Sequence, residues 1–219
     1  IPKNSKFSEK IKVCIIGGGN IGTLLLGDLG SINKVSVSLL TSKPERWNDV
    51  IEVYTADDIL THRGKIDLIS SKPQEVIKDA DILISTLPSH IFPSVISNIK
   101  PFITPGTLIG VIPGSGGVEF FTKDLIEKGC TLFGFQRVHG ISRIKEYGKS
   151  VYDLGKKREI FISAIPTNNT EEIRELMEQL LGIQCYALPN YLNITLTPSN
   201  PILHTTRLYS LFKNYREGV

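Results

Sequence analysis

The chain of 219 residues has the length of one large domain or one and a half ordinary ones. Hydrophobic residues make up 41% and charged residues 21%, which is close to the globular average and excludes a disordered chain. The formal charge of +3 is too small, and Lys and Arg are too evenly spread, to indicate nucleic-acid binding. No apolar run approaches the roughly 20 residues of a membrane-spanning helix, so no membrane partner is predicted.

Cysteine usage and the start of the chain indicate the compartment. The three cysteines are widely separated and form no CxxC pair, which favours neither a zinc site nor a disulfide framework, so no metal is predicted. The polar stretch IPKNSKFSEK is not typical of a secretory signal. Together these features predict a reducing, cytoplasmic location.

Short apolar runs alternate along the chain with segments of helical spacing. Strands are predicted over 12–16, 35–40, 81–86, 107–112 and 131–138, with further strand pattern over 150–164. Segments 52–56 and 64–70 are predicted to pair as a small antiparallel hairpin. Helices are predicted over 21–29, 71–78, 89–99 and 170–181, the last with Thr170 as its cap. Two more are predicted: one opened by segment 113–117 and running to about residue 128, and one from about residue 200 to the end of the chain. This alternation predicts an α/β fold with a doubly wound, mainly parallel Rossmann sheet.

Three consecutive glycines interrupt the apolar run IKVCIIGGGNIGTLLLGDLG. Gly17, Gly19 and Gly22 have the spacing G-x-G-x-x-G between a predicted strand and a predicted helix, which is the context of a dinucleotide-binding turn. The first glycine permits the tight turn, the second lets the backbone approach a diphosphate, and the third lets the helix pack closely on the strand. With Asn20 and Ile21 they present a helix N-terminus to the phosphates. The alternative is a turn that merely happens to be rich in glycine.

The end of the second predicted strand is expected to select the cofactor. NAD sites usually have an acidic residue there, which binds the ribose 2′-hydroxyl. Here the strand is followed by Thr41, Ser42 and Lys43, with Arg46 close behind. Hydroxyls and two cations suit a 2′-phosphate, which favours NADP(H) and leaves NAD open. The alternative is that these are solvated loop residues.

Two further loops are expected at the same edge of the sheet. Segment STLPSH (85–90) follows an apolar strand, and in a doubly wound sheet ligands lie beyond the carboxyl ends of the strands. Leu87 and Pro88 are therefore predicted to border the ribose or the nicotinamide. Loop PGSGG (113–117) follows the next strand, and its glycines permit close backbone approach. A plain loop is the alternative for each.

Three longer stretches carry a resemblance that extends from Lys12 to the end of the chain. VIPGSGGVEFF, LFGFQRVHGISRIKEYGKSV and LTPSNPILHTTRLYSLF resemble the opine dehydrogenase family, of octopine and nopaline dehydrogenase type. The resemblance implies an NAD(P)H-dependent enzyme with small-molecule substrates, in which an amino acid and a 2-oxo acid condense to an imine that is then reduced. A ketopantoate-type reductase of a simple 2-oxo acid and a non-catalytic nucleotide-binding module are the alternatives.

The same resemblance implies roles for individual side chains. The family's catalytic histidine matches His204 in the motif N-P-x-x-H, and a group that titrates near neutrality suits the proton transfer that accompanies hydride transfer. Asn200 lies one helical turn earlier and is expected to hold a substrate carbonyl or the nicotinamide amide. Gln136 and Arg143 are expected to bind substrate, because opine substrates carry carboxylates, with a structural role as the alternative. His139 stands where the family often has proline.

The resemblance also predicts the domain organisation. Residues 1–196 are expected to form the NAD(P)-binding Rossmann domain, and residues 197–219 the start of a helical second domain. The chain is therefore expected to be a fragment of a longer enzyme or to obtain the missing wall from a partner, and a homodimer is left open. The apolar side of the late helix, with Leu208, Leu211 and Phe212, is expected to seek another surface.

Overall fold

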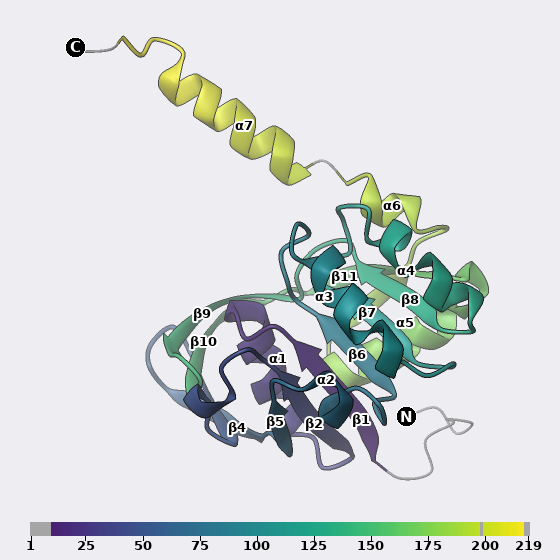
Figure 1. Cartoon of the computed structure of the whole chain (residues 1–219). Coiled ribbons are helices and arrows are strands. Elements are labelled where there is room, and N and C mark those ends of the chain that lie inside the picture. The colour runs from purple at the N-terminus through teal and green to yellow at the C-terminus, as the bar shows by residue number, and fades with distance from the viewer. Residues whose placement is uncertain (1–9, 198, 217–219) are drawn as a thin grey trace.

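An eight-stranded sheet runs through the computed structural model, which describes residues 10–197 and 199–216 (Figure 1). Its strand order is β12-β11-β8-β7-β6-β1-β2-β5, and all neighbours are parallel except β8 and β11. The strands are β1 (Ile11–Ile16), β2 (Val35–Leu40), β5 (Leu68–Ser70), β6 (Ile82–Ser85), β7 (Leu108–Val111), β8 (Thr131–Phe135), β11 (Glu159–Ile165) and β12 (Gln184–Ala187). The strand order reverses between β1 and β6, so the predicted doubly wound Rossmann sheet is confirmed.

Helices cover both faces of this sheet. One core cluster joins it to α1 (Asn20–Gly30) and α5 (Thr170–Leu181). The other joins it to α2 (Pro73–Val76), α3 (Phe92–Ile99), α4 (Val118–Glu127) and α6 (Leu192–Thr195). Three single turns, η1 (Pro44–Arg46), η2 (Lys100–Phe102) and η3 (Thr167–Asn169), connect these elements. Over residues 10–197 and 199–216, the structure contains no helix with the length and apolar character needed to span a membrane.

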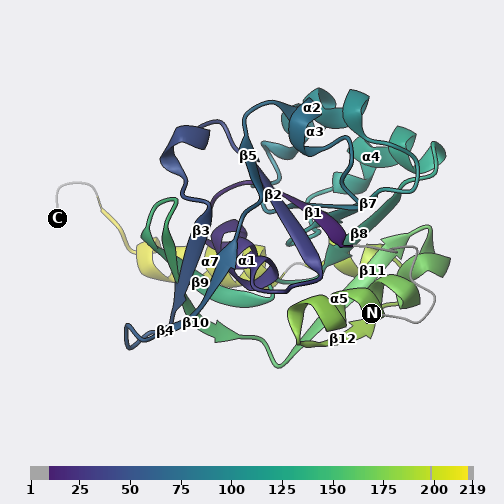
Figure 2. The ribbon, with the colours of Figure 1, turned by 90° about the horizontal axis from the view of Figure 1, so that it is seen from below.

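A second sheet of four strands covers the opposite side of α1 (Figure 2). Its order is β4-β3-β10-β9, with β3 (Val50–Tyr54), β4 (Leu60–Lys65), β9 (Gly140–Glu146) and β10 (Ser150–Lys156). Strand β4 and helix α1 are in direct backbone contact, since a Cβ atom at Gly64 of β4 would lie 2.1 Å from the carbonyl oxygen of Gly27 in α1. Every residue from Gly22 to Leu29 is buried between the two sheets, which explains why α1 is mostly apolar around its circumference, with Asp28 as its only charged residue.

The second sheet corrects the predicted pairing of segments 52–56 and 64–70. β3 pairs antiparallel with β4, whereas β5 pairs parallel with β2 in the large sheet. The chain crosses from one sheet to the other at Asp67, whose N–H donates to the carbonyl of Val37 at 2.7 Å and whose carboxylate accepts from Ser36 at 2.8 Å. The segment 64–70 thus serves two sheets, which a single predicted strand did not anticipate.

Two helix ends also differ from the expectation. Asn169 precedes the first turn of α5, and Thr170 is already helical; its hydroxyl accepts from the N–H of Ala164 at 3.1 Å and so ties α5 to β11. The last helix, α7 (Ser199–Phe212), ends at Phe212 rather than continuing to the end of the chain. Figure 1 shows α7 standing away from the two sheets.

A buried charge joins α1 to the second sheet. The carboxylate of Asp28 accepts hydrogen bonds from Nε2 of His62 at 2.9 Å and Nζ of Lys156 at 3.0 Å. Burial alone would raise the pKa of Asp28, but these two partners outweigh it and lower the pKa. His139 lies nearby and is fully buried, and neither of its ring nitrogens has a hydrogen-bond partner in the described part of the chain.

Candidate nucleotide-binding site

A cleft of about 440 Å³ opens at the carboxyl ends of β1 and β2, beside the point where the strand order reverses. Ile16 and Leu40, the last residues of these strands, form its floor, and the glycine turn follows directly. Thr41, Ser42, Ser71, Pro73 and Tyr147 line one part, and residues of the loop after β6 and of α3 line the rest, among them Leu87, Ile91 and Val95. Doubly wound sheets bind ligands at this place.

The glycine turn is closed by backbone contacts that leave no room for side chains. Gly17 has a φ of +108°, and its carbonyl accepts a hydrogen bond from the hydroxyl of Thr86 at 3.2 Å. A Cβ atom at Gly22 would lie 1.9 Å from that same carbonyl oxygen. Gly17 and Gly22 therefore have the two structural roles that the spacing predicts, a tight turn and close helix packing.

Gly19 has no such contact. It is exposed, and a Cβ atom there would meet no described atom within 4 Å. Gly19 is also the residue before the first turn of α1, and no side chain caps that turn. The first N–H groups of a helix need partners, and anions are stabilised there by the helix dipole. This open, uncapped helix start fits a phosphate group, which is the feature that distinguishes the site from a turn rich in glycine for packing alone.

Gly18 has a different neighbour. A Cβ atom at this position would lie 2.1 Å from Cζ2 of Trp47, so the indole ring requires a glycine here. Asn20 also serves the protein, since its side-chain oxygen accepts from the N–H of Ile144 at 2.8 Å and fastens β9 to the start of α1. The backbone N–H of Asn20 and of Ile21 belong to the uncapped first turn.

The end of the cleft beside β2 has hydroxyls and cations. Thr41 and Ser42 line it, whereas Lys43 and Arg46 are exposed just outside. The guanidinium of Arg46 lies over the ring of Tyr147, with Cζ 4.6 Å from the ring centroid. Neither Lys43 nor Arg46 has an ion-pair partner in the described residues.

The carboxylate on the neighbouring helix α2 is already engaged. Glu75 accepts from the hydroxyl of Ser70 at 2.5 Å and from Nζ of Lys72 at 3.1 Å, and these bonds lower its pKa. Glu45, in the turn η1, is exposed. The end of β2 itself carries no acid, so its polar groups suit a phosphate better than a ribose hydroxyl that seeks an acceptor.

Of the two predicted loop residues, Leu87 lines the cleft and Pro88 does not. Leu87 lines the cleft and packs against the glycine turn, since a Cβ atom at Gly17 would lie 2.9 Å from its Cδ2. Pro88 is exposed, and its carbonyl accepts from the N–H groups of Ile91 and Phe92, which opens α3. Leu87 thus forms a wall of the cleft, and Pro88 shapes the loop behind it.

The two predicted substrate residues lie in different parts of the molecule. Gln136 follows β8, and its Nε2 donates to the carbonyl of Asn193 in α6 at 3.1 Å. Arg143 lies on β9 in the second sheet, exposed, with Nη1 donating to the carbonyl of Ser142 at 2.8 Å. Neither lines the cleft, and the structure does not bring them together.

The predicted catalytic pair lies on α7. Asn200 and His204 are one turn apart on this helix, as the spacing predicts, and the side chain of His204 is exposed. The described side chains of α7, residues 202–212, are all exposed, and none of them lines the cleft. The helix is connected to the rest through α6, where Thr195 donates to the carboxylate of Glu119 at 2.9 Å.

Tyr147 is one of several cleft residues that the sequence analysis did not identify. It comes from the turn between β9 and β10, which is far from the glycine turn in sequence and belongs to a sheet that was not predicted. Its signal in the sequence is faint: an aromatic residue directly before a glycine in EYGKS. Gly148 has a φ of +76°, so this is a tight turn with an aromatic side chain at its tip.

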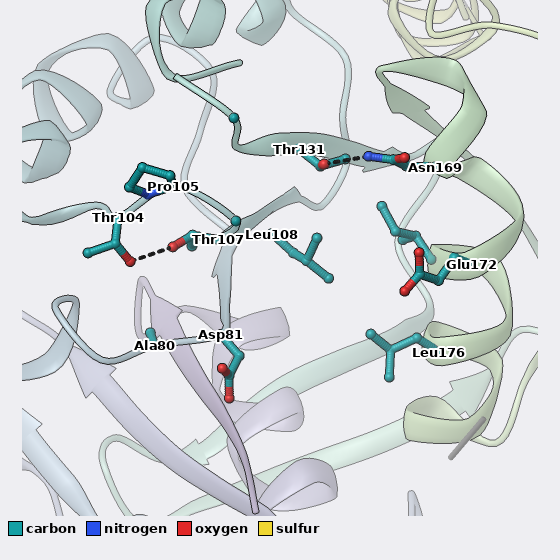
Figure 3. Close-up of a pocket in the computed structure, with 13 residues that line it drawn as sticks. Ala80, Asp81, Thr104, Pro105, Thr107, Leu108, Thr131, Asn169, Glu172 and Leu176 are labelled. Atoms are coloured by element: carbon teal, nitrogen blue, oxygen red, sulfur yellow. Dashed lines mark hydrogen bonds between the residues drawn. The ribbon is translucent and has the colours of Figure 1, made fainter. Parts of the chain in front are cut away.

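A second cavity, of about 310 Å³, lies at the amino ends of β7 and β8 against α5 (Figure 3). The carboxylates of Asp81 and Glu172 line it, together with threonine hydroxyls. Some of its polar groups already bond within the protein: Asn169 donates to Thr131 at 2.8 Å, and Asp81 accepts from the N–H of Lys12 at 2.8 Å. Two carboxylates disfavour a bound anion, so this cavity suits a phosphate group less well than the cleft at the opposite edge of the sheet.

Comparison with known proteins agrees with this geometry. The family model described as NADP oxidoreductase, coenzyme F420-dependent, matches residues 12–116. Tauropine dehydrogenase of Arabella iricolor is 27% identical over 225 residues, which cover 94% of this chain and 56% of that protein. Octopine dehydrogenase of Mizuhopecten yessoensis is 27% identical over 215 residues, covering 91% of this chain and 54% of that protein.

A solved structure of octopine dehydrogenase with NADH and L-arginine superimposes with a TM-score of 0.83 and 25% identity. The match covers 96% of this chain and 56% of that protein, so the chain spans about half the length of the relatives that it matches. By sequence and by fold, the chain is thus similar to the opine dehydrogenases over most of its length.

Proposed function

We propose that this chain is the nucleotide-binding part of an enzyme of opine dehydrogenase type, which joins an amino acid to a 2-oxo acid and reduces the resulting imine with NADPH. The observation that carries the proposal is the open backbone at Gly19, before the uncapped start of α1 and beside a cleft at the switch point of the sheet. Packing explains the other glycines of the turn, whereas a phosphate explains this one.

The cleft offers a place for each part of the cofactor. The diphosphate is bound at the turn formed by Gly17, Gly19, Asn20, Ile21 and Gly22. At the end of β2, Thr41 and Ser42 hold the ribose, and the cations Lys43 and Arg46 bind the 2′-phosphate that distinguishes NADPH from NADH. Leu87 borders the nicotinamide side of the cleft, with Pro88 shaping its loop. When bound, the nicotinamide supplies the hydride.

The remaining roles fall to side chains that approach the cleft once the full active site is assembled. His204 transfers the proton that accompanies the hydride, and Asn200, one turn away, holds a substrate carbonyl or the nicotinamide amide. Gln136 and Arg143 bind substrate carboxylates. Because Gln136, Arg143 and helix α7 lie apart in the structure, the substrate pocket requires a further protein surface to complete it. The exposed apolar residues of α7 are suited to contact that surface.

The test is NADPH oxidation by the full-length protein over panels of 2-oxo acids and amino acids. The proposal requires that turnover depends on both co-substrates. Turnover with a 2-oxo acid alone would instead indicate a reductase of the ketopantoate type. Tight NADPH binding without turnover on either panel would indicate a non-catalytic nucleotide-binding module.

Two further properties complete the proposal. Exposed apolar residues on α7, namely Leu208, Leu211 and Phe212, require a cover, which a homodimer or a further domain supplies; sedimentation of the full-length protein separates the two. A cytoplasmic location fits the three cysteines, which are free and buried in the structure. Burial raises the pKa of the Cys14 thiol to about 12, so it is an inert core residue.

A further inference from the structure

The turn between β9 and β10 fits closely against the segment that follows β2. The N–H of Asn48 donates to the carbonyl of Gly148 at 2.9 Å, and a Cβ atom at Gly148 would lie 2.0 Å from the carbonyl oxygen of Arg46. Between these backbones the ring of Tyr147 meets Trp47 edge to face, with 5.3 Å between centroids. Segments about a hundred residues apart thus form one wall at the adenosine end of the cleft.

Tyr147 contacts both the cleft and a cation. Its side chain is half-buried and lines the cleft together with Gly18, Thr41 and Ser42. The guanidinium of Arg46 lies over its ring at 4.6 Å. A guanidinium held over an aromatic ring keeps its N–H edge available for other partners, and that edge matches the geometry of a phosphate.

Lys145 in the second sheet is a cation with both an aromatic and a carboxylate partner, and it serves as a comparison for Arg46. Nζ of Lys145 lies 3.7 Å from the ring centroid of Tyr54, and the same ammonium is bound by the carboxylate of Asp58. Arg46 has the aromatic partner but no carboxylate among the described residues. Its charge therefore remains for an anion beside Thr41 and Ser42.

From this arrangement we infer that Tyr147 is a positioning residue for cofactor choice: it holds Arg46 where the 2′-phosphate of NADPH lies, so that the second sheet takes part in distinguishing NADPH from NADH. The inference rests on the proposed function, because it requires a dinucleotide in the cleft. The inference adds to the proposed function one residue, Tyr147 from the second sheet, which acts on the 2′-phosphate and not on the rest of the cofactor.

The experiment is calorimetric titration of the full-length protein with NADPH, NADH, 2′,5′-ADP and 5′-ADP. Tyr147→Leu fills the space against Trp47 but lacks an aromatic face, so the affinity for NADPH and 2′,5′-ADP falls about fivefold or more. The affinity for NADH and 5′-ADP stays within about twofold, because these ligands lack the group that Arg46 binds. Tyr147→Phe keeps the ring and retains the preference for NADPH.

Two variants complete the design. Arg46→Ala is expected to lose at least as much NADPH affinity as Tyr147→Leu, and the double variant no more than Arg46→Ala, since the two residues act through one contact. Tyr186→Ala removes an exposed ring on β12, at the far edge of the large sheet, and leaves all four affinities unchanged.

The inference is overturned if Tyr147→Leu weakens NADPH and NADH equally, if it weakens neither, or if its loss adds fully to that of Arg46→Ala. A wild-type protein that binds NADH as tightly as NADPH overturns it as well, while leaving the dinucleotide site intact. A wild-type protein that binds none of the four ligands refutes the proposed function itself. Circular dichroism of each variant shows whether the fold is retained, and Tyr147→Met, which also lacks an aromatic face, takes the place of Tyr147→Leu if that variant does not fold.

Discussion

The indole ring of Trp47 occupies the space that a side chain at Gly18 would need, with Cζ2 only 2.1 Å from the position of the missing Cβ atom. Trp47 is buried and belongs to the segment after η1, so the glycine turn is packed from behind by a residue that follows β2. The middle glycine of the three is thus a packing residue, whereas Gly19, which follows it, faces open space.

Gly18→Ala should therefore lower stability. The added methyl group forces the ring of Trp47 to move, and overpacking of this kind costs about 1–3 kcal/mol of unfolding free energy. Urea denaturation followed by circular dichroism measures the loss. In the background Trp47→Leu, where the ring is gone, the same substitution should cost clearly less; an equal cost in both backgrounds would show that the contact is not its cause.

Gly19→Ala should have the opposite profile. No described atom lies within 4 Å of the new methyl group, so the unfolding free energy should change by less than about 0.5 kcal/mol. The methyl group lies where the diphosphate approaches the backbone, and losing a hydrogen bond to a charged group weakens NADPH binding about 10- to 100-fold. Calorimetry and thermal unfolding of the same preparation separate the two effects, and unchanged NADPH affinity would exclude the turn as the phosphate site.

Much of the fold was predictable because its signals are local. Five strands of the large sheet, β1, β2, β6, β7 and β8, appear as short apolar runs, and the glycine turn appears as the fixed spacing of Gly17, Gly19 and Gly22. These signals need no information about distant residues. The edge strand β12 was not predicted, and β5 was assigned to the hairpin. The resemblance to opine dehydrogenases, first noted in three stretches, is confirmed by the comparisons over most of the chain.

The second sheet was not predictable in the same way, since it joins strands from distant parts of the chain. β3 pairs in parallel with β10, about a hundred residues later, and this pairing carries Tyr147 to the cleft. The mostly apolar character of α1 was the available signal, because a helix with apolar residues on both faces requires cover on both. The substrate residues remain a prediction: Gln136, Arg143, Asn200 and His204 lie on elements that the described residues do not bring together.

Trp47 should report on cofactor binding, because it is the single tryptophan of the 219 residues. It is buried beside Gly18 and in edge contact with Tyr147, both of which line the cleft. Titration of this chain with NADPH should therefore quench or shift its fluorescence, with energy transfer to the reduced nicotinamide as a second signal. Trp47→Phe should abolish the signal while calorimetric binding persists, and a fluorescence unaffected by saturating NADPH would place the cofactor elsewhere.

Stability should depend on pH through His139. Burial lowers the pKa of this imidazole from 6.5 to about 4, an effect that the nearby charges of Asp28 and Asp153 only partly oppose and that of Lys156 reinforces. Between pH 4 and pH 6.5 the unfolded chain binds a proton at this imidazole that the folded chain excludes. The free energy of unfolding is therefore unaffected by His139 above pH 6.5 and decreases as the pH falls from 6.5 towards 4. The expected slope is at most about 1.4 kcal/mol per pH unit.

Urea denaturation at intervals from pH 7 to pH 4.5 measures this slope. His139→Leu should flatten it, and His90→Leu, at an exposed position, should leave it as in the wild type. The lowered pKa of Asp28 acts in a separate range, because its stabilisation is lost only as the pH falls below the usual aspartate value of 3.8. A slope that persists in His139→Leu would assign the pH dependence to another group.

His204→Ala should remove turnover without removing the cofactor. The residue lies on α7, away from the cleft, so the affinity for NADPH should stay within about twofold of the wild type. Loss of a general acid–base group typically lowers kcat about a hundredfold to ten-thousandfold. Steady-state kinetics of the full-length protein with both co-substrates gives kcat, and calorimetry gives the affinity for NADPH.

Thr206→Ala, two residues further along the same exposed helix, is the matched control and should retain near-normal kcat. Normal turnover in His204→Ala would move the proton transfer to another residue, whereas a joint loss of turnover and NADPH binding would show that α7 contributes to the cofactor site itself.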